Sequence, residues 1–145
     1  MELLTRENIQ LDIEAATKEQ ALAFVADLAV KRGYSADAAG VLDGLKERES
    51  QLSTSLMSGI AIPHTRHASV QDPAVLVVRL ASSVDWTDDN VHVLIAMLVP
   101  DGGDNTTHLQ LLAQVSRALI EDDVQRAVIE GTADEIFSEL AGRLN

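Results

Sequence analysis

Three short apolar runs rich in β-branched residues constrain the fold of this chain more than any other feature of its sequence. They span residues 60–62, 75–80 and 91–99, and each is bounded by a proline or another turn residue. Short β-branched runs between turn residues predict buried β-strands rather than helices. The last run is almost continuously apolar, which indicates a strand covered on both of its faces.

Segments with helical periodicity precede these runs. Thr17 and Gln20 belong to a Thr-Lys-Glu-Gln sequence with the form of a capping box, and apolar residues follow at helical spacing up to Gly33. This pattern predicts a helix that ends at the glycine. A second helix is predicted to begin near Ser35 and to end in the charged stretch 46–49.

Three further helices are predicted after the apolar runs. The first spans about 107–121, the second about 122–130, and the third follows another capping-box pattern that begins at Thr132. A short extended piece at 9–11 precedes all of the helices. Helices before, between and after strands predict an α/β fold, a three-layer sandwich in which a mixed β-sheet has helices on both faces. The strand order does not follow from this pattern.

Length and charge limit the classes of protein to consider. A length of 145 residues without a linker or repeat predicts a single domain spanning 1–145. The formal net charge of −12 disfavours nucleic acid and anionic membranes as partners and favours a partner with a basic face. The chain starts with charged residues where a signal peptide needs an apolar stretch, and its longest apolar run, 93–100, is too short for a membrane span. The absence of cysteine suits a reducing cytoplasm, so we expect a cytoplasmic protein without a metal or cofactor.

The acidic residues are unevenly distributed. No Asp or Glu occurs in 50–71, a window that holds several hydroxyls, two histidines and Arg66. A second acid-free stretch, 105–120, contains His108. If the two stretches meet in space, their side chains can donate hydrogen bonds to a phosphate without opposing its charge. The alternative, which composition alone favours, is that the hydroxyl-rich window is an ordinary loop.

The four histidines differ in their expected surroundings. His64 follows Pro63 directly after a predicted strand, where a side chain is more readily presented than packed. His108 is expected in the first turn of a helix, whose N–H groups attract anions, whereas His92 lies inside a predicted strand. His67 forms a His-x-x-His pair with His64, but the window holds no cysteine or carboxylate, which disfavours zinc. No Gly-x-Ser-x-Gly sequence supports serine hydrolysis.

Histidine chemistry suits phosphoryl transfer. An imidazole is half neutral at about pH 6.5, so at neutral pH its nitrogen can attack phosphorus and later release the phosphoryl group. Donors must hold the three equatorial oxygens as the group moves between nucleophiles. The candidates for these donors are Arg48, His108 and the Thr54 hydroxyl.

Several of these residues form a recognisable motif. Arg48-Glu49, Ser53-Thr54 and the sequence Gly-Ile-Ala-Ile-Pro-His at 59–64 together resemble the signature of fructose/mannitol-type enzyme IIA domains (EIIA type 2). These domains belong to the bacterial phosphoenolpyruvate-dependent sugar phosphotransferase system. The similarity extends over nearly the whole chain, including 98–100 and 108–112. It implies an α/β sandwich with a mixed sheet.

The resemblance also implies a role for each matching residue. His64 would accept a phosphoryl group from phospho-HPr, as a tele-phosphohistidine, and pass it to an enzyme IIB domain for coupled sugar uptake. His108 would hydrogen-bond the phosphate, Arg48 would lie beside it, and Thr54 would belong to the stabilising hydroxyl segment. Glu49 is interpreted as structural or as orienting Arg48. Sugar recognition and the membrane IIC component would lie on other chains.

Departures from the family pattern leave alternatives open. Relatives usually have a glycine-containing loop where this chain has residues 55–58, and a small residue is common where it has Thr65. The alternative function is that of a regulatory, nitrogen-type EIIA, whose phosphorylation controls binding to target proteins, although the segment around Trp86 resembles the sugar branch. A third possibility is a phosphate- or metal-binding domain that uses His64 and His67.

Overall fold

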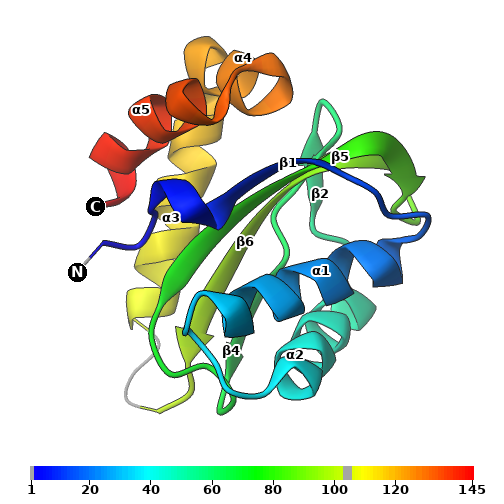
Figure 1. The fold of residues 1–145 in the computed structure, drawn as a ribbon, viewed down its shortest axis with the longest axis vertical. Helices are drawn as coiled ribbons and strands as arrows, with labels where there is room; N and C mark the ends of the chain where they lie inside the picture. The colour runs from blue at the N-terminus through cyan, green and yellow to red at the C-terminus, as the bar shows by residue number, and fades with distance from the viewer. Residues whose placement is uncertain (1, 103–105) are drawn as a thin grey trace.

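A mixed six-stranded sheet lies between two layers of helices in the computed structural model, which describes residues 2–102 and 106–145 (Figure 1). In chain order the elements are η1 (Arg6–Asn8), β1 (Ile9–Ile13), α1 (Lys18–Lys31), α2 (Ala38–Gln51), β2 (Ser55–Met57), β3 (Ile60–Ala61), β4 (His64–His67), β5 (Ala74–Asp85), β6 (Asn90–Pro100), α3 (Thr106–Ile120), α4 (Asp122–Glu130) and α5 (Ala133–Leu144). The predicted α/β sandwich is confirmed. Position 105, where the second acid-free stretch begins, lies outside the described residues.

Strand β6 forms the centre of the sheet. One edge of β6 pairs antiparallel with β5, which in turn pairs parallel with β1. The other edge pairs parallel with β3 and, further along, with β4. Ile62 and Pro63 connect these two short segments, and the backbone N–H of Met97 donates to the Pro63 carbonyl at 3.0 Å. The connection places His64 at the start of β4, directly beside the central strand.

Alternating side chains of the sheet supply two separate cores. One face packs against α3, α4 and α5 and includes Val75, Val77, Val93, Ile95 and Met97. The other face packs against α1 and α2 and includes Leu76, Val78, Leu94, Ala96 and Leu98. Successive side chains of a strand point to opposite faces of the sheet, so the continuous apolar run of β6 contributes to both cores. Figure 1 shows the two helical layers on opposite sides of the sheet.

Local capping explains where the helices begin. The Thr17 side chain accepts a hydrogen bond from the Gln20 N–H, and the predicted capping box at Thr132 is complete. The second helix does not begin near Ser35 as predicted. It begins at Ala38, because the side chain of Asp37 accepts the Gly40 N–H and caps the helix there.

The segment predicted as a loop before Gly59 is a β-hairpin. Residues 55–57 form β2, which pairs antiparallel with β3. Ser58 and Gly59 connect the strands with φ values of +53° and +76°, which is the left-handed geometry of a two-residue hairpin turn. The hairpin was missed because β2 has only three residues, none of them fully buried, and so lacks the pattern of a buried strand.

None of the helices in the described parts of the chain combines the length and apolar character that a membrane crossing requires.

Candidate active site

His64 is buried at the start of β4 and does not project from a loop. Its residue is 5% exposed, and its backbone position pairs with Met97 of β6. The expectation that the strand ends at Pro63 and presents the next side chain was therefore wrong. The proline interrupts the pairing for a short stretch, after which the chain resumes its place beside β6. Such a position holds the imidazole more firmly than a loop would.

Helix α2 approaches β4 closely enough to bring Arg48 to this histidine. A Cβ atom at Gly44 would lie 2.6 Å from Thr65 Oγ1 and 3.0 Å from His67 Cδ2, so a larger residue would push the helix away. Arg48 follows Gly44 by four residues and lies on the same helix face. Its Nε donates a hydrogen bond to His64 Nε2 at 3.0 Å. The lack of a side chain at Gly44 thus lets α2 lie close enough to β4 for Arg48, one turn later, to contact His64.

The hydrogen bonds of His64 define its tautomer. Its Nδ1 lies 2.8 Å from the carbonyl oxygen of Ile62, which can only accept, so Nδ1 carries the proton. Its Nε2 faces the guanidinium of Arg48, which can only donate, so Nε2 carries a lone pair. Both contacts require the same neutral imidazole. The nitrogen that remains available as a nucleophile is therefore Nε2.

A second histidine approaches from the opposite helical layer. The rings of His64 and His108 lie with their centroids 5.4 Å apart and their planes tilted by 58°. The two histidines line a cleft of about 210 Å³ together with Gly44, Glu47, Arg48, Gln51, Thr65, Arg66 and His67. Small-molecule sites usually exceed about 300 Å³. The cleft therefore suits a group the size of a phosphoryl rather than a whole sugar.

Burial and the nearby arginines lower the pKa of both histidines. Burial lowers the pKa of His64, and the charges of Arg48 and His108 lower it further, against the opposing effects of the Ile62 carbonyl and Glu49. Burial also lowers the pKa of His108, with added contributions from Arg66 and Arg48. A neutral imidazole keeps a lone pair, so these shifts favour a nucleophile at neutral pH.

This pKa shift predicts how stability depends on pH. The unfolded histidine titrates near 6.5, whereas folding lowers the pKa of His64, so the unfolded state binds more protons between the two values. We expect the free energy of unfolding to be constant above this window and to fall as the pH drops from about 7.5 to about 5.5. Urea unfolding at both pH values measures the change, and His64→Asn should reduce it. A stability that rises on acidification would contradict the assigned neutral state.

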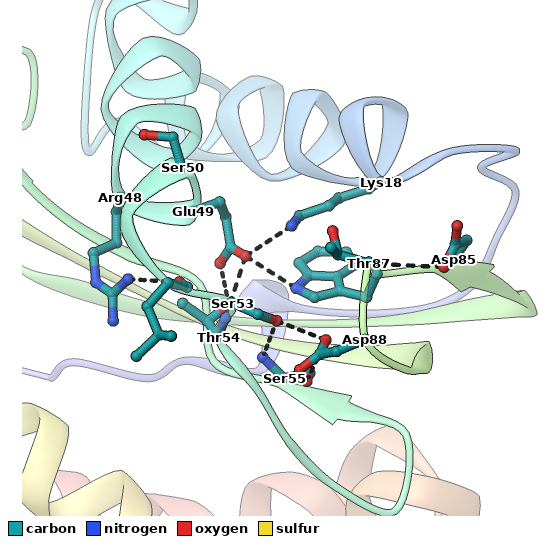
Figure 2. A network of polar contacts seen from close by, with 12 residues as sticks. Lys18, Arg48, Glu49, Ser50, Ser53, Thr54, Ser55, Asp85, Thr87 and Asp88 are labelled. Carbon is teal, nitrogen blue, oxygen red and sulfur yellow. Dashed lines mark hydrogen bonds and ion pairs between the residues drawn. The ribbon is translucent and has the colours of Figure 1, made fainter.

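Three consecutive hydroxyls of the acid-free window, at 53–55, bind carboxylates that come from outside it. Figure 2 shows the Ser53 and Ser55 side chains donating to Asp88, and the Thr54 hydroxyl donating to Glu49. Thr54 is 4% exposed. In this state the Thr54 hydroxyl donates to Glu49, and the direct phosphate contact expected of it stays a prediction. The window is acid-free in sequence but not in space.

The remaining basic residues near the cleft have separate contacts. Arg66 lines the cleft, and its Nε lies 3.8 Å from Asp101. His67 also lines the cleft, and its Nδ1 lies 2.8 Å from the Ser69 hydroxyl. His92 lies on β6, as its predicted strand implied, and is half-buried against Gly59, outside the cleft. Within the described residues, His, Asp and Glu side chains form no group of three or more that could hold a metal ion.

Sequence reasoning assigned Glu49 no direct function and passed over Gly44. The sequence around Gly44 does not show why a glycine is needed there, because the reason is the close contact of α2 with Thr65 on β4. Glu49 stands beside Arg48 in the motif, but its partners lie on other elements. Neither set of contacts follows from spacing along the chain.

Comparison with known proteins gives consistent results. The family model described as "Phosphoenolpyruvate-dependent sugar phosphotransferase system, EIIA 2" matches residues 2–142. The chain is 36% identical over 137 residues to the PTS system fructose-specific EIIA component of Haloferax volcanii, covering 92% of this chain and 88% of that protein.

Two solved structures share the fold and more than a quarter of the sequence. The nitrogen regulatory protein IIA-Ntr from Neisseria meningitidis superposes with a TM-score of 0.84 at 27% identity, covering 95% of this chain and 96% of that one. The enzyme IIAMTL in complex with phosphorylated enzyme IIBMTL from Escherichia coli superposes with a TM-score of 0.78 at 29% identity, covering 96% and 97%.

Proposed function

Because this chain belongs to the EIIA 2 family of the phosphoenolpyruvate-dependent sugar phosphotransferase system, we propose that it carries a phosphoryl group on Nε2 of His64. The donor in this proposal is phospho-HPr and the acceptor is an enzyme IIB domain. The observation that carries the proposal is the neutral tautomer of His64, whose Nε2 lone pair faces Arg48 in a cleft of phosphoryl size. We further propose that residues 1–145 act as one such domain, since both helical layers pack on a single sheet.

The transfer step follows from these contacts. The Nε2 lone pair attacks phosphorus, a bond between Nε2 and phosphorus forms, and the donor's leaving atom keeps the electrons of the bond that breaks. Nδ1 keeps its proton throughout because the Ile62 carbonyl continues to accept it. Arg48 must release Nε2 for the attack, and its guanidinium is then close enough to hold the oxygens of the arriving group. No proton has to leave the protein.

An EIIB partner is supported by the solved complex of enzyme IIAMTL with phosphorylated enzyme IIBMTL, which superposes on this chain. Support for transport of a sugar of the fructose or mannitol type comes from the names of the relatives. The small volume of the cleft fits a carrier whose sugar is bound by other components.

The proposed relay can be tested with purified components. The protein is incubated with phosphoenolpyruvate, enzyme I and HPr, and ³¹P NMR identifies the phosphorylated atom. We expect a signal of tele-phosphohistidine that appears only when HPr is present. The labelled protein is then mixed with a panel of fructose-type and mannitol-type IIB domains, and at least one of them should remove the label. A chain that takes up no label from phospho-HPr would contradict the donor assignment.

The same experiment separates transport from regulation. The superposition on the nitrogen regulatory protein IIA-Ntr favours a regulatory role as the second candidate. In that case the protein would still be phosphorylated, but no IIB domain of the panel would remove the label. Its binding to a target protein would instead change with phosphorylation.

Replacing His108 should slow transfer without removing the acceptor. Its ring lies 5.4 Å from that of His64, where it can hydrogen-bond a phosphoryl group on Nε2. We expect His108→Ala to retain labelling at His64 and to pass the label to EIIB about 100-fold more slowly, the usual cost of losing one donor to a transferred group. Rapid-quench measurement of label on each protein gives both rates. Unchanged onward transfer would contradict the role assigned to His108.

A further inference from the structure

The carboxylate of Glu49 is buried and receives hydrogen bonds and an ion pair from several parts of the fold. Its side chain is 5% exposed, and its Oε1 lies 2.9 Å from Lys18 Nζ and 3.1 Å from Trp86 Nε1. The backbone N–H of Thr54 donates to the same oxygen at 3.2 Å, and the Thr54 hydroxyl donates to Oε2. Lys18 lies at the start of α1, Thr54 in the connection between α2 and β2, and Trp86 in the connection between β5 and β6. Figure 2 shows Lys18 and Thr54 beside the carboxylate.

The side chains that hold Glu49 are themselves fixed. Trp86 is fully buried, and its backbone N–H donates to the Asp89 carbonyl at 2.8 Å within the connection between β5 and β6. Lys18 lies 4.9 Å from the centre of the Trp86 ring, a distance at which a cation is attracted to an aromatic face. The carboxylate is therefore anchored to the first turn of α1 and to the core.

From Thr54 a continuous series of hydrogen bonds leads to the nucleophile. The Thr54 carbonyl accepts the backbone N–H of Ile62 at 3.0 Å. The Ile62 carbonyl accepts the Nδ1 proton of His64 at 2.8 Å, and this contact defines the tautomer. Glu49 holds Thr54 by both its N–H and its hydroxyl, so the carboxylate fixes the far end of the series. Neighbouring Arg48 binds the same segment, since its Nη1 donates to the Leu52 carbonyl at 2.8 Å.

We propose that Glu49 is a positioning residue for phosphoryl transfer, which acts through Thr54 and Ile62 to keep the proton of His64 on Nδ1. The proposal rests on the proposed function of His64. If the Ile62 carbonyl moves, only the Arg48 contact still opposes a proton on Nε2, and a protonated Nε2 has no lone pair for phosphorus. Free imidazole side chains favour the tautomer with the proton on Nε2, so contacts within the protein must stabilise the one with the proton on Nδ1.

Stability alone does not account for this arrangement. A buried ion pair contributes little to stability, because removing both charges from water offsets most of their attraction. The carboxylate affects geometry more than stability, because its two oxygens accept hydrogen bonds that fix the positions of two chain segments. The negative charge of Glu49 also raises the pKa of His64, so removing that charge favours the neutral ring. A loss of transfer rate in a Glu49 variant at alkaline pH would therefore not reflect protonation of His64.

The test compares four variants of the full chain. Glu49→Ala removes the carboxylate, Thr54→Val removes the hydroxyl that binds it, and Thr54→Ser restores that hydroxyl. Leu140→Ala is the control for lost stability, because Leu140 is fully buried in the core formed with α5, among the residues packed on the other face of the sheet. ¹⁵N NMR of the unphosphorylated histidines at about pH 8, where the rings are neutral, reports the tautomer of His64. Rapid-quench labelling from phospho-HPr reports the rate.

We expect the wild-type protein and Leu140→Ala to show His64 protonated on Nδ1. Glu49→Ala and Thr54→Val should show a mixture of tautomers and accept the phosphoryl group about 10- to 100-fold more slowly, the effect of a misplaced reacting group. Thr54→Ser should recover most of what Thr54→Val loses. The tautomer is measured on the unphosphorylated protein. If Thr54 instead contacts the phosphoryl group directly, Thr54→Val would slow the transfer rate but leave the tautomer of His64 unchanged.

The proposal is overturned if folded Glu49→Ala and Thr54→Val keep the single Nδ1 tautomer, or if Leu140→Ala changes the tautomer equally. If Glu49→Ala fails to fold, the comparison of Thr54→Val with Thr54→Ser tests the proposal, because only Thr54→Val removes the hydroxyl that binds Glu49. Failure of the proposed function has a different signature. The wild-type protein would then accept no label, while the tautomer measurement would still show whether Glu49 positions His64.

Discussion

Replacing His64 by alanine is expected to abolish acceptance of the phosphoryl group from phospho-HPr. His64 offers a buried, neutral imidazole with a lone pair on Nε2, and alanine provides no atom that could replace this nucleophile. Arg48 and His108 would remain, but they can hold a phosphate without forming a bond to it. Incubation with labelled phosphoenolpyruvate, enzyme I and HPr, followed by gel separation, measures the incorporated label.

The matched control for this experiment is His92→Ala. His92 is a histidine on the same sheet that is more exposed than His64, packs against Gly59 and does not line the cleft. We expect the control to accept label at the wild-type rate. Normal labelling of His64→Ala would show that the acceptor is a different residue. Loss of labelling in both variants would indicate damage to the fold, which circular dichroism would detect.

The second large effect is expected from Arg48. In the structure its Nε donates to Nε2 of His64, the proposed nucleophile, and its Nη1 donates to the Leu52 carbonyl, so the guanidinium already lies beside that atom. An arginine that stabilises a transferred phosphoryl group contributes about 1,000-fold or more to the rate, so Arg48→Ala should lose at least that factor. Arg48→Lys should recover part of the loss, because an ammonium keeps the charge but not the paired donors.

A second measurement on Arg48→Ala is independent of phosphate. The guanidinium lowers the pKa of His64, so its removal should raise that pKa toward the ordinary value of histidine. An NMR titration of the His64 ring detects this change. Arg126→Ala is the control, since Arg126 lies on α4 and is largely exposed beside Asp123. If Arg48→Ala transferred phosphoryl groups as fast as the control, the guanidinium would have no part in catalysis.

The sequence predicted the architecture well where local patterns are strong. The apolar runs became β3, β5 and β6, and the periodic segments became the five α-helices, because burial of one face or of both faces imposes a local period. Prediction failed for β2, which has only three residues, and for β4, whose polar sequence lines the cleft. These strands are held in place by pairing with β3 and β6 rather than by an apolar pattern of their own.

The candidate site was predicted in part. The motif led to His64, Arg48 and His108, and the structure brings these three side chains together from β4, α2 and α3. The acid-free window led to the expectation that its hydroxyls can donate hydrogen bonds to a phosphate. In the structure, hydroxyls of this window donate to the carboxylates of Glu49 and Asp88 instead. Spacing along the chain carried no sign of either carboxylate.

By itself, then, the sequence determined the fold class, the positions of most helices and the identity of the histidine proposed to react. These properties depend on neighbouring residues, through periodicity, capping and a short motif. The tertiary structure alone decided which nitrogen of His64 keeps its proton and which groups hold Thr54 in place. The lone pair of His64 faces Arg48 of α2, 16 positions earlier in the chain, and the carboxylate that holds Thr54 is itself held by Trp86, 37 positions after Glu49. Such contacts exist only once the sheet and its two helical layers have assembled.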